Sequence, residues 1–346
     1  MRRILTLWLA FLLLTAGCGA GEEKEFVPLF SGEGETDWAQ PIPVLMTLSE
    51  KEASFTYTCA QHFKELVESY SQGRFYVDIY PDNGIGSMET SDYMLQHNRV
   101  QLRLGPGPSQ LVHFLGLTSL SQSTLESIPK IMSDPEWLEL LNEECLEKGT
   151  RLLGALPPLY RVVTSDRPIE TAEEFQGLRM RYTGSIYSQT IWEPLGCTMV
   201  KVDLDSIEAA LNSRVVDAWT DNTLIHYLMF ERYRIQTYVM ETRQQIYIEP
   251  FYVSEAFFQS LSGEDQALFQ RAVDETALWA QTARETWISA YKGELEQYGV
   301  EHILLSEEEL AKISGQNHDQ LLELMEERIG EERIQRAYAL LERDSG

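Results

Sequence analysis

The feature that most constrains the fold is a regular alternation of short strand patterns with amphipathic helix patterns from about residue 42 onward. Apolar spacings of three and four predict helices over 54–71 and 88–96, and β-rich apolar runs predict strands over 44–48, 75–80 and 100–104. Alternation of this kind builds α/β layers around a largely parallel sheet, because each helix carries the chain back to the start of the next strand.

The second half continues the alternation and ends in a long helix pattern. Residues 246–253 form the longest strand pattern, and the cap signal of residues 262–265 opens a helical run to about residue 298. Further strands are predicted over 151–156, 160–164, 179–182, 199–202 and 215–219, with helices over 172–175, 185–195, 206–211 and 223–232. About 30 helical residues span about 45 Å, which is longer than one small domain, so this helix is expected to cross two domains or to fold into a hairpin on one.

Charge excludes one class of partner. The 346 residues are enough for two domains, and 28 Lys and Arg against 54 Asp and Glu give a formal net charge of −26. Such a surplus repels phosphate backbones, so nucleic-acid binding is not expected. An acidic small-molecule ligand needs a local cationic pocket, because the field of the whole chain opposes it. The arginines are therefore the candidate binding residues.

The first 18 residues are typical of an export signal. Two arginines precede an apolar run over 4–14, which is too short to span a bilayer and ends in small residues before Cys18. This ending resembles a bacterial lipoprotein box, in which Cys18 becomes the lipidated first residue, although an ordinary secretory signal is the alternative. The Gly- and Glu-rich residues 19–41 are expected to form a flexible tether.

Cysteine and histidine spacing points to neither a redox centre nor a metal site. Cys59, Cys145 and Cys197 have no CxxC spacing and are expected to be small buried hydrophobic residues. The six histidines show no HxxxH or HxH spacing, and we find no P-loop, GxSxG or GxGxxG motif. We therefore expect no metal and no cofactor.

Three stretches in order resemble one known family, the DctP-type solute receptors of tripartite ATP-independent periplasmic (TRAP) transporters. Residues 63–86 (FKELVESYSQGRFYVDIYPDNGIG) are similar to the family's helix, "xGR" turn and strand, with Ile85 where Leu is usual. Residues 167–181 (RPIETAEEFQGLRMR) are similar to its Pro-Ile, acidic helix and "GLKxR" run. Residues 195–219 keep its Leu-Gly, Ala-Leu and Val-Asp spacing. The likeness covers about residues 42–300.

The resemblance implies a two-domain α/β fold of the type II periplasmic-binding-protein kind, with a hinge and a long helix spanning both domains. It places domain I at 42–158 plus 247–286 and domain II at 159–246 plus 287–346. It implies a monomeric, non-enzymatic receptor outside the cytoplasm that closes on a small organic acid. The receptor would deliver this acid to the small and large membrane subunits of an ion-gradient-driven permease, and the lipid on Cys18 would anchor it to the membrane.

The resemblance also names binding residues. Arg181 matches the arginine that forms a salt bridge with the ligand carboxylate, and its place at the end of a predicted strand suits a ligand site. Arg161 matches a second arginine near the ligand. The family's Asn position falls on Asn222 or Asp221, and the amide of Asn222 is preferred because it can donate to a carboxylate. Trp219 is expected to stack on the ligand or to fill the core.

The sequence leaves open which domain I residues bind the ligand and whether the protein has another function. Glu50, Tyr57 and the loop at 105–109 border the expected cleft in domain I but carry no specific signal. A secreted hydrolase that uses two carboxylates is an alternative function of another class. A receptor domain of the same fold that only signals to a membrane sensor is a third.

Overall fold

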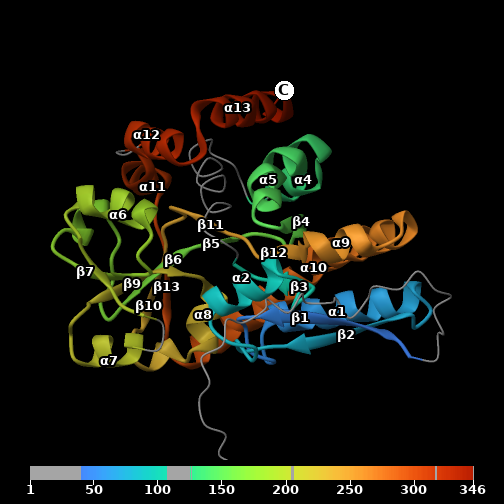
Figure 1. Ribbon diagram of the computed structural model, residues 1–346. Coiled ribbons are helices and arrows are strands. Elements are labelled where there is room, and N and C mark those ends of the chain that lie inside the picture. The colour runs from blue at the N-terminus through green and yellow to red at the C-terminus, as the bar shows by residue number, and fades with distance from the viewer. Residues whose placement is uncertain (1–39, 107–124, 126, 204–205, 316–317, 346) are drawn as a thin grey trace, which may run out of the picture. The chain divides into compact units, whose positions relative to one another are not determined.

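The computed structural model describes residues 40–106, 125, 127–203, 206–315 and 318–345 (Figure 1). Residues Gln40–Gly346 form one compact unit. Cys18 and the rest of the predicted signal and tether, apart from residues 40–41, lie outside the described residues, as do residues 107–109 of the loop predicted to border the cleft.

The first sheet has five strands in the order β2-β1-β3-β12-β4. Four of them (β1, β2, β3 and β4) run in the same direction, and β12 runs antiparallel to both β3 and β4. The strand bounds are β1 Ile42–Leu48, β2 Phe75–Tyr80, β3 Leu102–Leu104, β4 Thr150–Ala155 and β12 Pro250–Ser254. Helix α1 (Phe55–Tyr70) begins at Ser54, whose Oγ accepts a hydrogen bond from the Tyr57 amide, and buries its predicted apolar face against this sheet.

The second sheet has six strands in the order β13-β10-β6-β9-β7-β8. Strand β7 is parallel to both β8 and β9, whereas β6 is antiparallel to β9 and β10. The strand bounds are β6 Val162–Ser165, β7 Arg179–Tyr182, β8 Thr198–Lys201, β9 Ala218–Asn222, β10 Tyr238–Glu241 and β13 Glu301–Leu304. Among the described strands, each sheet therefore has one reversed member, β12 in the first and β6 in the second. The other strands of each sheet point the same way, so the expectation of a largely parallel sheet is confirmed.

Apart from shifts of up to two residues, three predicted strands differ from the structure, and the one over 160–164 is divided into β5 (Leu159–Tyr160) and β6. The predicted strand over 215–219 lies at 218–222, because the Val215 and Val216 amides donate to Ala210 O and so belong to the turn that ends helix α7 (Ile207–Asn212). The predicted strand over 246–253 is divided into β11 (Ile246–Tyr247) and β12. The position of β9 at 218–222 matters for function, because it places Asn222 inside the strand.

The remaining helices include those predicted over 88–96, 185–195 and 223–232, and two over 127–147 that the sequence patterns did not predict. They are α2 Met88–Gln96, α4 Ser127–Ser133, α5 Pro135–Glu147, α6 Ile186–Trp192, α8 Leu224–Met229 and α9 Glu255–Ser260, with short 3-10 turns η1 Ala172–Phe175, η2 Glu193–Leu195 and η4 Arg232–Arg234. The predicted helix over 185–195 is α6 followed directly by η2, whose residue Pro194 prevents the α-helical hydrogen-bond pattern from continuing.

The chain passes between the two sheets through a short ribbon and one long helix. Strand β5 (Leu159–Tyr160) pairs antiparallel with β11, and both lie between segments of the first and second sheets in the chain. Helix α10 (Gly263–Gln297) contacts α1 and β4 on the first sheet's side and α8 on the second's. The predicted long helix is confirmed, and the ribbon and helix form the connection expected of a hinged two-domain fold. The domain boundaries given above stay a prediction.

The C-terminal helices touch both halves of the molecule (Figure 1). Helices α11 (Glu307–Gly315) and α12 (His318–Ile329) pack on α6, and α13 (Glu331–Ser345) packs on α5. On α5, Glu143 accepts from Arg333 and from Arg336 of α13. These helices therefore add a second connection between the two halves, besides the ribbon and α10.

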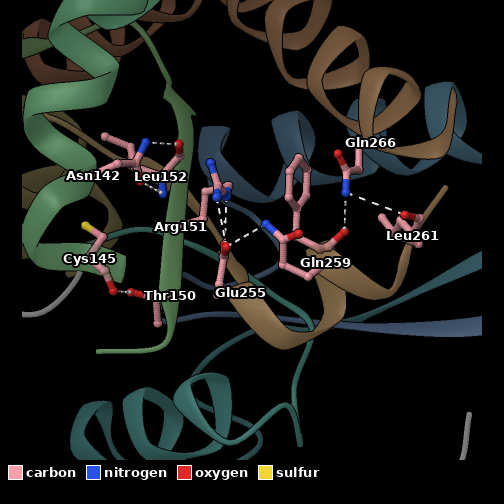
Figure 2. A network of polar contacts seen from close by, with 10 residues as sticks. Asn142, Cys145, Thr150, Arg151, Leu152, Glu255, Gln259, Leu261 and Gln266 are labelled. Atoms are coloured by element: carbon pink, nitrogen blue, oxygen red, sulfur yellow. Dashed lines mark hydrogen bonds and ion pairs between the residues drawn. The ribbon is translucent and has the colours of Figure 1, made fainter. Parts of the chain in front are cut away.

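Side chains of neighbouring helices form hydrogen bonds and an ion pair with residues of the edge strand β4 (Figure 2). The Asn142 amide donates to Leu152 O at 3.0 Å and accepts from the Leu152 amide at 2.7 Å. Arg151 forms a two-pronged ion pair with Glu255 of α9. The Asn142 contacts occupy the outward N–H and C=O of Leu152, so this residue is not free to pair with another strand.

The cysteines that the structure describes are buried thiols, as predicted. Cys59, Cys145 and Cys197 are free, and burial raises the pKa of the Cys145 thiol to about 11 and that of Cys197 to about 12. Such thiols are poor nucleophiles near neutral pH, because the reactive thiolate is scarce. Across the described ranges, no helix combines the length and the apolar character needed to cross a membrane.

Candidate functional site

Three adjacent strands of the second sheet bring the predicted binding residues together at one end of the strands. Because β7 and β9 are parallel, their carboxyl ends lie side by side, and these ends hold Arg181 and the pair Asp221–Asn222. Strand β6 runs the other way, so its beginning lies beside the end of β9 and brings Arg161 to the same place. Sequence positions up to 61 residues apart thus converge as the resemblance implied.

Arg181 is buried without a carboxylate partner. Its side chain is 2% exposed, its Nε donates to Val202 O at 2.8 Å, and its guanidinium lies 5.5 Å from the centre of the Trp219 ring. Among the described residues, no carboxylate forms an ion pair with it. Burial lowers the pKa of Arg181 to about 10, against the opposing effect of Asp221, so the group stays charged at neutral pH.

The neighbouring arginine on the same strand differs sharply. Arg179 is exposed and binds Asp217 with two hydrogen bonds, from Nε at 2.9 Å and from Nη2 at 2.6 Å. A guanidinium can hold a planar carboxylate in this forked way, and at Arg179 the protein itself supplies the carboxylate. At Arg181, Nε is already bonded to Val202 O, and no carboxylate among the described residues forms an ion pair with its two Nη groups.

Both carboxylate oxygens of Asp221 accept hydrogen bonds from other residues of the protein. One carboxylate oxygen accepts from the Thr183 amide and from Thr183 Oγ1, each at 3.0 Å, and the other accepts from Ser188 Oγ. Its backbone is left-handed, with φ of 60°, a conformation that Asp tolerates better than most residues. Asp221 therefore fixes the end of β9 and compensates part of the nearby arginine charge.

Unlike the carboxylate of Asp221, the polar side-chain groups of Asn222 and Trp219 have no hydrogen-bond partner among the described residues. Asn222 is fully buried, and neither its amide oxygen nor its amide nitrogen has a hydrogen-bond partner within the described residues. The indole nitrogen of Trp219 is also buried without a partner there. A buried polar group without a partner costs about 1–3 kcal/mol, so these groups are poised for a ligand or a water molecule.

Two further arginines surround this cluster. Arg161 donates from Nη1 to Asp221 O, and its guanidinium lies 5.1 Å from the centre of the Tyr247 ring. Arg232 of η4 is 7% exposed and reaches Glu208, and its positive charge also acts on Arg181. The sequence motifs did not single out Arg232, because it lies beyond the stretches that carry the resemblance.

The structure describes the surroundings of Tyr57 and Glu50, and their place at the cleft stays a prediction. Tyr57 packs against the apolar core of the first sheet. Glu50 is buried beside His226 rather than beside the arginines, with His226 Nε2 at 3.2 Å from Glu50 Oε1. Neither residue forms a hydrogen bond or an ion pair with Arg181 or Asn222.

Taken together, these residues can hold an anionic group in a dry setting. A buried cation that no described carboxylate pairs with, an amide without hydrogen-bond partners among the described residues, and an aromatic ring suit recognition of a small acid. A two-sheet α/β chain with a long connecting helix and such a cluster is a protein of the solute-binding class.

The family is shown by comparison with known sequences. The chain belongs to family 7 of the bacterial extracellular solute-binding proteins, the DctP family, whose model matches residues 46–328. It is 25% identical over 242 residues to the sialic acid-binding periplasmic protein SiaP of Vibrio cholerae, covering 66% of this chain and 73% of that protein. It is 25% identical over 288 residues to the ectoine-binding periplasmic protein TeaA of Halomonas elongata, covering 80% and 75%. The resemblance identified from the sequence is confirmed.

Solved structures show the same fold. A TRAP periplasmic solute-binding protein from Marinobacter aquaeolei, in an apo open form, matches with a TM-score of 0.76 at 23% identity, covering 86% of this chain and 99% of that one. One from Shewanella oneidensis with bound succinate matches with a TM-score of 0.73 at 20% identity, covering 87% and 99%. The predicted two-domain periplasmic-binding fold is therefore confirmed.

Proposed function

We propose that this chain is an extracytoplasmic receptor that binds a small organic acid and delivers it to the membrane subunits of a TRAP transporter. The observation that carries the proposal is the buried Arg181, which has no carboxylate partner in the described chain and lies in register with Trp219. Arg181 would hold the ligand carboxylate, with Asn222 donating its amide and Trp219 covering one side. Arg161 and Arg232 would strengthen the local positive field.

The remaining parts of the proposal rest on the sequence and on the family. Lipidation of Cys18 would anchor the chain outside the cytoplasm, and residues 19–41 would act as the tether. The receptor would work as a monomer and without catalysis. Binding would close the two halves around the ligand, since the residues proposed to hold it lie near β5 and β11, which connect the sheets.

The binding function is tested with a panel of acids. The relatives are described with sialic acid, succinate, glucuronate, galacturonate and orotic acid, so these form the panel. We expect at least one acid to raise the melting temperature, and native mass spectrometry to show one intact ligand per chain. Turnover of the ligand on incubation would instead favour a hydrolase. If no acid binds and none co-purifies, the proposal fails.

A second prediction separates binding from stability at Asn222. We expect Asn222→Leu to leave the free energy of unfolding unchanged or to raise it by about 1 kcal/mol, because the replacement removes an unpaired buried amide. The same change should weaken binding of the acid at least tenfold. Chemical unfolding and calorimetry measure the two effects.

Asn142→Leu is the matched control. Asn142 is also a buried asparagine, but both of its amide atoms are bonded to Leu152. This variant should lose about 1–3 kcal/mol of stability and keep its affinity. If Asn222→Leu behaves like Asn142→Leu, Asn222 is a structural residue and not a ligand contact.

A further inference from the structure

A second group of buried polar side chains lies apart from the arginine cluster. It consists of Glu50, which follows β1, His226 of α8, and Glu249, which precedes β12. Each offers a ligand atom, and these atoms all lie within 4.8 Å of one another. They come from three separate segments, so no spacing in the sequence could reveal them, and the expectation of no metal site was based on spacing alone.

Each of these side chains except Glu50 is held by a further hydrogen bond. Glu249 accepts from Thr56 Oγ1 at 2.7 Å and from the Tyr247 hydroxyl at 3.2 Å. His226 Nδ1 lies 2.9 Å from Thr223 Oγ1. When Nδ1 carries the proton and donates a hydrogen bond to Thr223 Oγ1, the lone pair of Nε2 points toward Glu50. Outer hydrogen bonds of this kind orient the ligands of metal sites.

Two carboxylates meet in this place, and within the described residues only His226 forms an ion pair with either of them, its Nε2 lying 3.2 Å from Glu50 Oε1. Glu50 and Glu249 are both buried, at 7% and 8% exposure, and share one cavity. Two carboxylates at this spacing repel each other strongly where water is excluded. Among the described cations nearby, Arg161 is bound to Asp221 O and packs on Tyr247, and Arg284, which also lines the cavity, donates to Pro158 O. Neither arginine forms an ion pair with the two glutamates.

The cavity has the size of a single ion. About 20 Å³ is open to a water-sized group in the cavity that Glu50, His226 and Glu249 line together with apolar residues such as Phe55 and Leu156. That volume is enough for one water molecule or one metal ion.

We propose that Glu50, His226 and Glu249 bind one divalent transition-metal ion, of the Zn²⁺ or Mn²⁺ class. Imidazole together with two carboxylates suits these ions, whereas Mg²⁺ and Ca²⁺ prefer ligand sets made only of oxygen. The ion would join Glu50, beside the first sheet, to His226, on a helix beside the second. This inference does not depend on which acid the arginine cluster binds.

The test uses the full chain freed of metal by a chelator. We expect calorimetry to show one Zn²⁺ per chain, and saturating Zn²⁺ to raise the melting temperature by about 3 °C or more. Mg²⁺ should give no comparable rise. His226→Gln and Glu249→Gln should each weaken Zn²⁺ binding at least tenfold. Thr56→Val keeps the ligands and removes one outer hydrogen bond, and it should weaken binding about tenfold.

His302→Gln is the control for histidine–glutamate pairs in general. His302 Nε2 lies 3.0 Å from Glu241 Oε1, but no second carboxylate joins that pair to form such a group among the described residues. This variant should bind Zn²⁺ like the unmodified chain. The proposal is overturned if the unmodified chain binds no Zn²⁺ or if His226→Gln and His302→Gln bind it equally. In either case Glu50 and His226 form only an ion pair, and acid binding measured with the panel is unaffected.

Discussion

Replacing Arg181 with alanine is expected to weaken binding of the acid at least tenfold. The guanidinium is buried and has no carboxylate partner in the described chain, so a ligand carboxylate would be its counter-ion. Removing one partner of a desolvated charge pair costs about 2–5 kcal/mol, much of which reflects the charge left unpaired. Calorimetry with the acid selected by the panel measures the loss, and circular dichroism confirms that the variant folds.

Two further variants show whether the effect belongs to Arg181 itself. Arg179→Ala removes an arginine two residues away on the same strand, which is exposed and already paired with Asp217. It should bind the acid normally. Arg181→Lys keeps the charge but loses the forked donors, so its affinity should fall between those of the alanine variant and the unmodified chain. Equal affinity in Arg181→Ala and Arg179→Ala would exclude Arg181 from the binding site.

Replacing Asp221 with alanine is expected to lower the free energy of unfolding by about 3–5 kcal/mol. The change removes the carboxylate that accepts from Thr183 and Ser188, and it removes part of the negative charge that offsets the buried Arg181. Alanine is also strained at the left-handed backbone conformation of this position. Unfolding in urea at neutral pH measures the loss.

An exposed ion pair gives the comparison for Asp221. Asp166 lies 3.9 Å from Arg214, and both side chains are at least half exposed. Asp166→Ala should cost about 1 kcal/mol or less, as is usual for surface pairs. Asp221→Asn tolerates the same backbone and keeps part of the hydrogen bonding, so it should lose less stability than Asp221→Ala. A loss at Asp221 no larger than that at Asp166 would show that its carboxylate is not a structural anchor.

The residues differ in how far the sequence could predict their environment. Arg181 was placed at a strand end by its local motif, and the structure confirms that location and shows the burial, while its role in binding stays a prediction. The choice between Asp221 and Asn222 needed the exact end of β9, which depends on how the turn after α7 uses the amides of Val215 and Val216. A shift of one residue along the strand replaces Asp221, whose carboxylate is hydrogen-bonded within the protein, by Asn222, whose amide has no partner among the described residues. A local sequence pattern could therefore favour Asn222 but could not predict the environment of its side chain.

The sequence by itself determined the α/β alternation, the long helix over 263–297 and the family, because helix and strand periods and short motifs are local properties of the chain. Only the tertiary structure decided that β6 and β12 run against their neighbours, that Asp221 is used internally, and that Glu50, His226 and Glu249 meet. Those features arise from contacts between residues as far as 199 positions apart. Their energies depend on burial and on which partners are near, and neither quantity is present in a local pattern.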